Sequence, residues 1–320
     1  MQIKNKKNLF IFFLLIFSLF NSTLFADEFN ITAKEIIIDK ENEIIIGKDS
    51  VKAVDLEGKV ITANKITYEK KREFLLAEGD VKINDIEGNI LKTKKATYDK
   101  INEIITTYDQ TELELKEGYK LKSKNILYDT EKKILNSSEV SIFTDSEGNI
   151  VETSMFQYQI ENNLFSSIGK IKITDVKTNK YFFKELHVDT KKKEMIGSDV
   201  SIALDQKNFG LSQENDPRFV ANDILISKNS TDLSKGVFTV CKKRKGKCPP
   251  WSLKSKKIRH DKIKKTIYYE HATLKVYDIP IFYFPRFFHP DPTVKRKSGF
   301  LPPFFTSENE KKHGGAFGDQ

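Results

Sequence analysis

The chain repeats itself every thirty residues, and this period constrains its fold more than any single residue does. One position of the repeat holds Ile38, Tyr68, Tyr98, Tyr128, Tyr158 and Val188, followed by Asp39, Glu69, Asp99, Asp129, Gln159 and Asp189. Six copies run from Ile31 to Asp205 with almost no insertions. A fixed period of this length is typical of repeat proteins, whose neighbouring units bury their apolar faces against each other. We therefore expect an elongated stacked surface and not one compact active site.

Three further columns of the repeat are mostly apolar or small. They are Ile31, Ile61, Leu91, Leu121, Val151 and Tyr181; then Ala33, Ala63, Thr93, Ser123, Thr153 and Phe183; then Ile36, Ile66, Ala96, Ile126, Phe156 and Leu186. Within one repeat, these three columns and the tyrosine column follow one another at spacings of two, three and two residues. A spacing of two residues indicates a β-strand. The spacing of three reverses which side of the strand faces inward, near Asn64 and Lys65. A bulge there would let one long strand bend around a core.

A second block of the repeat predicts a crowded inner position and a chain reversal. Small residues recur at Gly47, Ala77, Thr107, Ser137, Ser167 and Gly197. Glu-Gly pairs begin at positions 57, 87, 117 and 147, and glycine accepts the positive φ that tight turns require. We predict an all-β chain with about three short strands per repeat, some sixteen to eighteen in total.

The predicted core has two interpretations that composition does not separate. Ile, Leu, Phe and Tyr with small residues between them would pack into a closed solenoid. The same side chains would also line an open apolar trough that holds lipid chains.

The first twenty-six residues have the layout of a secretory signal peptide. Lys4, Lys6 and Lys7 precede an apolar run from Leu9 to Phe20, and Ala26 ends the segment. The run is short for a membrane span, although an uncleaved anchor is the alternative. In either case the rest of the chain is expected to be exported.

The net charge of +9 is concentrated in one segment. From Cys241 to Lys265 the chain has twelve Lys and Arg residues against the single acid Asp261. Such a field attracts phosphate, on nucleic acid or on lipid headgroups, and export favours lipid. The alternative is a solvated loop.

The chain has two cysteines, Cys241 and Cys248, both after the repeats. In an exported protein a nearby pair favours a disulfide over a free dithiol. Their spacing fits no zinc motif. No metal, cofactor or catalytic constellation is predicted.

The segment after the repeats changes character twice. Residues 206–234 are polar and suggest a connecting stretch, whereas Thr266–Val276 alternates like a strand. Pro280–Pro285 and the sequence Arg296-Lys-Ser-Gly-Phe-Leu301 follow. These two motifs resemble the signature of the LptD family of outer-membrane lipopolysaccharide assembly proteins, and the repeats resemble the OstA/LptA β-jellyroll.

The resemblance implies an order of domains and a non-enzymatic function. It implies a jellyroll at residues 27–205, a jellyroll continuation and connector with the basic cysteine loop at 206–290, and a truncated first barrel-strand region at 291–320. The jellyroll would receive lipopolysaccharide from a periplasmic bridge and pass it to an outer-membrane barrel. An LptE-like lipoprotein would be a partner if the full barrel exists.

The resemblance also implies site residues. The acyl-chain groove would be lined by Ile61, Ile66, Tyr68, Leu91, Tyr98, Leu121, Ile126, Tyr128 and Phe156. The edge strand near Ile31 would pair with an LptA-like bridge protein, and Pro303 or Pro302 would lie at the gate. Cys241 resembles the jellyroll-side cysteine of the family, but within this chain it could bond only Cys248.

Four other functions fit the sequence less well. An enzyme lacks a constellation among the five scattered histidines, and export argues against a nucleic-acid partner for the basic segment with Trp251. A structural or adhesive repeat protein would lack the Arg296–Leu301 motif. A soluble LptA-like bridge protein would end before Cys241.

Overall fold

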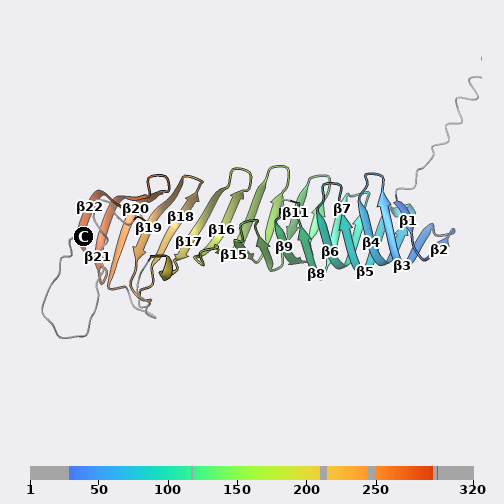
Figure 1. Ribbon diagram of the computed structural model, residues 1–320, viewed down its shortest axis with the longest axis horizontal. Coiled ribbons are helices and arrows are strands. Elements are labelled where there is room, and N and C mark those ends of the chain that lie inside the picture. Colours follow the sequence, from blue (N-terminus) through green and yellow to red (C-terminus); the bar gives the residue numbers. More distant parts are fainter. Residues whose placement is uncertain (1–28, 117, 210–214, 244–248, 291–293, 295–320) are drawn as a thin grey trace, which may run out of the picture.

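The structure is a computed structural model that describes residues 29–116, 118–209, 215–243, 249–290 and Val294. It is an elongated stack of antiparallel strands, with β1 and β2 at one end and β22 at the other (Figure 1). Besides strands, the described residues form two 3-10 helices, η1 (Lys70–Arg72) and η2 (Gln206–Phe209). The all-β fold expected from the sequence is confirmed.

The first repeats begin with two short strands, β1 (Phe29–Thr32) and β2 (Glu35–Asp39), which both pair with β3 (Ile44–Asp55). β3 is long, and it pairs in sequence order with the long strands β4 (Val60–Glu69), β5 (Phe74–Asn84) and β6 (Ile90–Asp99). The register shifts between Lys48 and Val51 on β3 and between Thr62 and Lys65 on β4. Each strand therefore bends at its centre, and its two halves turn their inward side chains to one core. The predicted bulge near Asn64 and Lys65 is confirmed.

In the middle of the stack the bend breaks the strands into separate pieces. These are β7 (Ile104–Tyr108), β8 (Gln110–Glu114), β9 (Lys120–Lys124), β10 (Leu127–Asp129), β11 (Ile134–Ser137), β12 (Ser141–Thr144), β13 (Ile150–Thr153) and β14 (Phe156–Gln159). One row of pairings runs β7–β10–β11–β14, and the other runs β8–β9–β12–β13. Both rows start from β6 and end on β15 (Leu164–Thr174). They are the two facing sheets of the stack.

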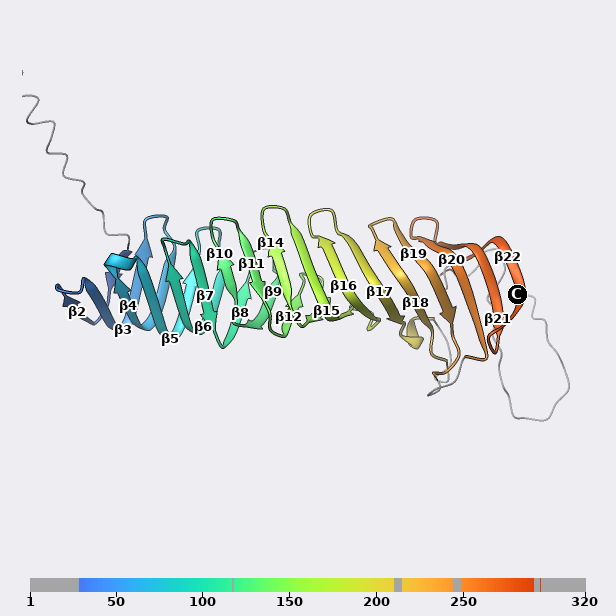
Figure 2. The same ribbon diagram turned by 180° about the vertical axis from the view of Figure 1, so that it is seen from behind.

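The last third of the stack returns to long paired strands, as the view from behind also shows (Figure 2). They are β16 (Lys180–Asp189), β17 (Glu194–Ala203), β18 (Arg218–Ile226), β19 (Ser230–Thr239), β20 (Trp251–Asp261), β21 (Thr266–Val276) and β22 (Ile279–Pro290). β21 has the bounds expected from the alternation. The connecting stretch expected at 206–234 is wrong from Arg218 onward, because β18 and the start of β19 continue the ladder.

The predicted number of strands in the repeats is confirmed, but their division among the repeats is uneven. β1 to β17 lie between Phe29 and Ala203, and the described chain has 22 strands in all. The second repeat consists of two bent strands, β4 and β5, and not of three short ones, because each strand continues through the bend there.

The crowded column and the glycine turns are confirmed. A Cβ atom added to Gly197 would lie 2.4 Å from Cδ1 of Phe183, and one added to Gly47 would lie 2.8 Å from Cγ1 of Val51. Gly58 and Gly148 have φ values of +89° and +94°, the left-handed conformation that favours glycine.

Candidate lipid groove

The predicted groove residues lie in the interior between the two sheets. One buried cluster contains Ile61, Ile66, Tyr68 and Tyr98, with Leu91 packed against it. The next cluster along the stack contains Leu121, Ile126 and Phe156. Tyr128 packs against both clusters. The apolar interior is therefore continuous through the middle of the stack.

Side chains fill this part of the interior. Ile66 is fully buried, and Tyr68, Tyr98 and Phe156 are no more than 3% exposed. Leu91 and Tyr128 are half-buried. Of the two interpretations left open by the sequence, the packed one describes this structure around these residues. Lipid chains would need the two sheets to part or the side chains to turn.

Aromatic contacts hold both parts of the interior. The ring of Phe29 on β1 meets the rings of Tyr68 and Tyr98 edge-on, with centroids 5.1 and 6.1 Å apart. Further along, Phe143 meets Phe156 edge-on at 4.7 Å. Edge-to-face pairs of this kind add about 1 kcal/mol each to the gain from burial.

The interior is closed on its long side where two rows of turns meet, a contact line we call the turn seam. One row contains the turns after β6 and β16, and the other contains the turns after β3 and β12. Lys100 Nζ lies 4.0 Å from Glu57 Oε1, and Lys193 Nζ lies 3.2 Å from Glu147 Oε1. Each pair joins a turn of one row to a turn of the other, so these ion pairs span the turn seam.

A polar network lies just inside the turn seam at Tyr98. The Tyr98 hydroxyl donates to Glu103 Oε2 at 2.9 Å, and Lys100 Nζ donates to Glu103 Oε1 at 2.6 Å. Burial, reinforced by the hydrogen bond to Glu103, raises the pKa of Tyr98 to about 12. Burial works against the charge of Lys100, but its hydrogen bonds to Glu103 and Tyr98 outweigh burial and raise its pKa. The network therefore stays ionised at Lys100 and Glu103 near neutral pH.

Tyr128, the next tyrosine of the column, also lies close to a turn of the opposite row. Burial, with the negative charges of Asp85 and Glu87, raises the pKa of Tyr128 to about 12. Asp85 and Glu87 belong to the turn after β5, whereas Tyr128 lies on β10. The tyrosine column thus lies under the turn seam.

Sequence reasoning missed an asparagine ladder along one row of turns. Asn179 donates through Nδ2 to Asp175 at 2.8 Å and accepts at Oδ1 from the Asp205 backbone N–H at 2.8 Å. Asn149 accepts in the same way from the Val176 N–H, and Asn89 from the Lys116 N–H. The signal was present in the sequence as Asn at 89, 149 and 179, spaced by multiples of the repeat.

The remaining predicted residues are only partly covered by the structure. Cys241 follows β19 and is half-buried. Cys248, Pro302, Pro303 and residues 1–26 lie outside the described residues, as does the 291–320 region apart from Val294. The disulfide, the gate and the signal peptide stay predictions. Trp251 is 4% exposed and packs against Phe238, so it offers no face for stacking on a base.

The described residues offer neither a metal site nor a helix that could span a membrane. They contain no group of three or more His, Cys, Asp or Glu side chains placed to hold a metal ion. No helix within the described ranges is long and apolar enough to cross a membrane.

Comparison with known proteins gives distant structural likenesses. No family model and no curated protein matches the chain. Among solved structures, the chain is similar to LptH of Pseudomonas aeruginosa, described as the LptA-homologous periplasmic component of the lipopolysaccharide transport device. The identity is 17% and the TM-score 0.32, over 35% of this chain and 85% of that one. At this level the likeness assigns neither ligand nor partner to the present chain.

Proposed function

We propose that the chain is a non-enzymatic carrier of lipopolysaccharide in the cell envelope, with its stack in the periplasm and its C-terminal side directed to the outer membrane. The observation that carries this proposal is the continuous apolar interior beneath the tyrosine column. Acyl chains would replace the side-chain contacts of Tyr68, Tyr98 and Tyr128. The resemblance of Pro280–Pro285 and of the sequence Arg296–Leu301 to the signature of the LptD family supports the direction of transport.

Opening would occur at the turn seam. The apolar interior is closed there by turn-to-turn contacts such as Lys100–Glu57, with side chains 20% and 68% exposed. An exposed ion pair contributes at most about 1 kcal/mol. Burial of acyl chains gains about 0.8 kcal/mol per methylene group. A few methylene groups therefore offset the loss of one such contact.

The N-terminal end is the proposed contact for an LptA-like bridge protein. In the described chain β1 and β2 each pair only with β3, so each leaves one strand edge unpaired. Ile36, Ile37 and Ile38 on β2 are 40–61% exposed. An unpaired edge of this kind accepts an added strand. An LptE-like partner would depend on a barrel beyond β22.

Photo-crosslinking tests the groove. A crosslinking side chain at Tyr68 or Tyr98 is expected to capture lipopolysaccharide in cells, because both rings point into the interior. Lys65 on β4 is the matched control: it lies on the same strand as Tyr68, points outward and pairs with Glu78. Equal capture at Tyr68 and Lys65 would overturn the groove.

One observation favours a second candidate, a soluble bridge module of the LptA type. In the described chain β22 pairs only with β21, so the stack has an unpaired edge at both ends. A module that extends at both ends would form head-to-tail filaments whose length rises with concentration. Light scattering of the purified chain separates this candidate from a chain that docks only at its β1–β2 end.

A further inference from the structure

The outer face of the repeats neutralises its lysines with acids on neighbouring strands. Lys65 and Lys95 both lie within 3.6 Å of Glu78, and Lys122 lies 2.8 Å from Glu112. In each case the base and the acid stand opposite one another in the ladder. Opposite charges across a strand pair stabilise a sheet modestly and leave little net charge.

At the bend of the strands the charge changes sign near the C-terminal end of the stack. In the repeats the bend residue with positive φ is an aspartate on several strands: Asp49 on β3, Asp80 on β5 and Asp199 on β17, with φ of +59°, +47° and +50°. At the same place β19 has Lys235 and β21 has His271, with φ of +50° and +51°. An acidic position of the repeat is therefore basic or neutral on these later strands.

The row of the ladder that contains Lys254 lies next to this bend, on the outer face of one sheet. Its members on β17 to β21, in order, are Ser201, Val220, Val237, Lys254 and Thr273. Side chains alternate along a strand, and Leu253 and Ser255 on either side of Lys254 are buried. Lys254 and its row therefore point away from the apolar interior.

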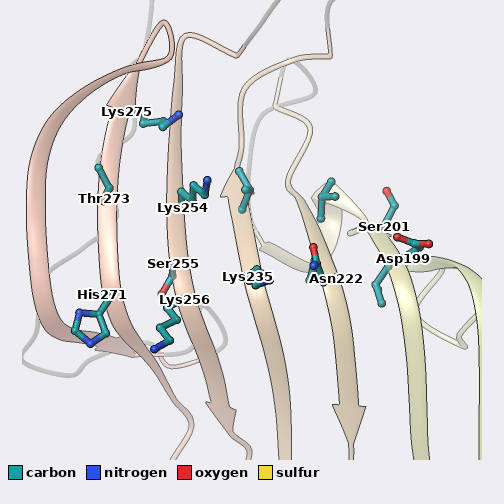
Figure 3. A pocket seen from close by; sticks show the side chains of 14 residues that line it. Asp199, Ser201, Asn222, Lys235, Lys254, Ser255, Lys256, His271, Thr273 and Lys275 are labelled. Atoms are coloured by element: carbon teal, nitrogen blue, oxygen red, sulfur yellow. The ribbon is translucent and has the colours of Figure 1, made fainter.

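A cavity of about 830 Å³ lies over this row and the bend (Figure 3). The row contributes all five of its members, and the bend contributes Asp199, Asn222, Lys235, Lys256 and His271. We call this cavity the lysine pocket. Its volume falls within the range of about 300–1,000 Å³ that is usual for small-molecule sites. It opens outward and is separate from the apolar interior.

Three lysines of the pocket have no counter-charge. Within the described chain, Lys235, Lys254 and Lys256 form no ion pair and no hydrogen bond through their side chains. A fourth lysine of the lining, Lys275, is balanced by Asp278 at 3.2 Å. The three unpaired ammonium groups are therefore available to a ligand.

The acid at one end of the pocket does not balance these three lysines. Asp199 is the only acid among the described residues of the lining, and its Oδ2 lies 3.1 Å from Nζ of Lys184. Like charges on neighbouring strands destabilise a sheet when no acid separates them. An anion in the pocket would relieve this repulsion.

Uncharged hydrogen-bond donors complete the lining. Asn222 has an amide NH2 group, and Ser201 and Thr273 have hydroxyl groups. His271 forms a 2.5 Å hydrogen bond with the Tyr283 hydroxyl through Nδ1, which leaves Nε2 for a ligand. Ammonium, amide and hydroxyl groups all donate to phosphate oxygens, so the set of donors fits a phosphorylated ligand.

We propose that the lysine pocket binds a ligand with at least two phosphate groups. One phosphate group carries a charge of at most about −2 near neutral pH, so balancing three lysines takes a second group. Lys254 and Lys256 lie about 7 Å apart along β20, and Lys235 lies on the next strand, about 5 Å away. Neighbouring phosphates can therefore contact different lysines. The two phosphates belong to a soluble diphosphate or to a lipid headgroup.

This site goes beyond the proposed carriage of lipopolysaccharide. The residues of the lysine pocket lie on the outside of one sheet, and the residues of the apolar interior lie between the two sheets. A chain that carries no lipid would still bind the diphosphate, and a chain without the three lysines would still carry lipid.

Calorimetric titration of the full chain with sodium pyrophosphate tests the proposal. Sodium chloride holds the ionic strength constant, so that screening by salt is the same in every titration. We expect one site per chain. In Lys254→Gln/Lys256→Gln the affinity should fall about fivefold for each lysine, and about 25-fold for both.

Lys257→Gln/Arg259→Gln is the matched control. It removes the same charge from the same strand, but the inward side changes between the buried residues Ser255 and Ile258, so Lys257 and Arg259 lie on the other sheet. Its affinity should stay within about twofold of the unchanged chain. Equal loss in the two variants would mean that the general positive field attracts the anion, and would overturn the pocket.

Vesicles of cardiolipin and phosphatidylcholine test the lipid source, because each cardiolipin headgroup has two phosphates. Pyrophosphate binding that depends on Lys254 and Lys256 supports a soluble ligand, and vesicle binding alone with the same dependence supports a headgroup. Binding of neither probe would overturn the proposal. Binding of duplex DNA that depends equally on all four bases would do so as well, since it would show an extended polyanion surface.

The variants replace exposed side chains and should keep the urea midpoint of the unchanged chain. If Lys254→Gln/Lys256→Gln misfolds, Lys235→Gln alone gives the same decision, with an expected loss of affinity of about fivefold. An unchanged affinity in a folded Lys235→Gln chain would overturn the pocket.

Discussion

Lys100, on the turn after β6, and Glu57, on the turn after β3, form a 4.0 Å ion pair although β4, β5 and β6 lie between them in the sequence. The pair joins the two rows of turns, and Lys100 also donates to Glu103 at 2.6 Å. Lys100 therefore connects the turn seam to the Tyr98 network. Its place makes it a sensitive probe of how firmly the stack is closed.

Replacement of Lys100 by glutamate should loosen the turn seam. The change removes the hydrogen bond to Glu103 and places a third acid near Glu57 and Glu103. We expect a loss of about 1–2 kcal/mol in the free energy of unfolding, since the side chain is partly screened by water. Amide hydrogen exchange should rise in Ile90–Asp99 and in Leu127–Asp129, and urea denaturation gives the free energy. Lys132→Glu is the control, because in the described chain Lys132 forms its ion pair with Asp129, at the end of the neighbouring strand, and is itself exposed. Equal exchange rates in the two variants would contradict a closing role for Lys100.

The small-residue column gives a second prediction. Gly197→Ala places a methyl group 2.4 Å from Cδ1 of Phe183, whose ring is 3% exposed and has little room to move. We expect a loss of about 1–3 kcal/mol from overpacking. Phe183→Leu in the same chain should restore part of the loss, and urea denaturation measures both variants. Ile196→Ala changes the adjacent, 56% exposed residue and should shift the free energy by no more than about 0.5 kcal/mol.

The bend of the strands was predictable from the sequence, but the places where the bend divides a strand in two were not. The step of three between Ala63 and Ile66 shows that the inward side changes, because side chains on a strand alternate. It does not show whether the ladder of hydrogen bonds continues through the bulge. At Asp109, with φ of +62°, the break divides β7 from β8, whereas at Asn64 the strand β4 is continuous.

The lining of the interior was likewise predictable, while its closure was not. Periodicity placed Ile66 and Tyr98 on the inward side, and both are buried. The ion pair of Lys193 with Glu147 depends on how far each strand runs before it turns, so no local pattern reveals it. The asparagine ladder was readable in principle, but Tyr119 and Lys59 interrupt its column.

The asparagine ladder gives a third prediction. Asn179→Leu removes the acceptor of the Asp205 N–H and the donor to Asp175, and Asn179 is only 7% exposed. Leaving such groups unpaired should cost about 1–3 kcal/mol in the free energy of unfolding. Asn162→Leu is the control, since Asn162 binds Gln159 on an exposed turn of the other row. A thermal or urea midpoint equally lowered in both variants would mean that the ladder contributes nothing beyond an ordinary turn.

The aspartates of the repeat turns predict a loss of stability in acid. The side chain of Asn42 lowers the pKa of Asp39 and that of Asn102 lowers the pKa of Asp99. Hydrogen bonds from Lys132 and Lys192 do the same for Asp129 and Asp189. A carboxyl whose pKa is lower in the folded state stabilises the fold above its unfolded pKa and loses that contribution as the pH falls through the folded pKa. The free energy of unfolding should therefore be flat near neutral pH and should fall once the pH drops below the ordinary value of 3.8.

Urea denaturation at a series of pH values measures this slope, and asparagine variants assign it to the turns. Replacing the four aspartates of the preceding paragraph by asparagine keeps an acceptor oxygen at each turn but removes the titrating group. The variant should be less stable at neutral pH, because the charged acceptor is stronger than the amide. It should also lose stability less steeply in acid, because four fewer groups bind protons on unfolding. A variant with an unchanged acid slope would place the sensitivity elsewhere, in Glu103 or in the cross-strand pairs of the outer face.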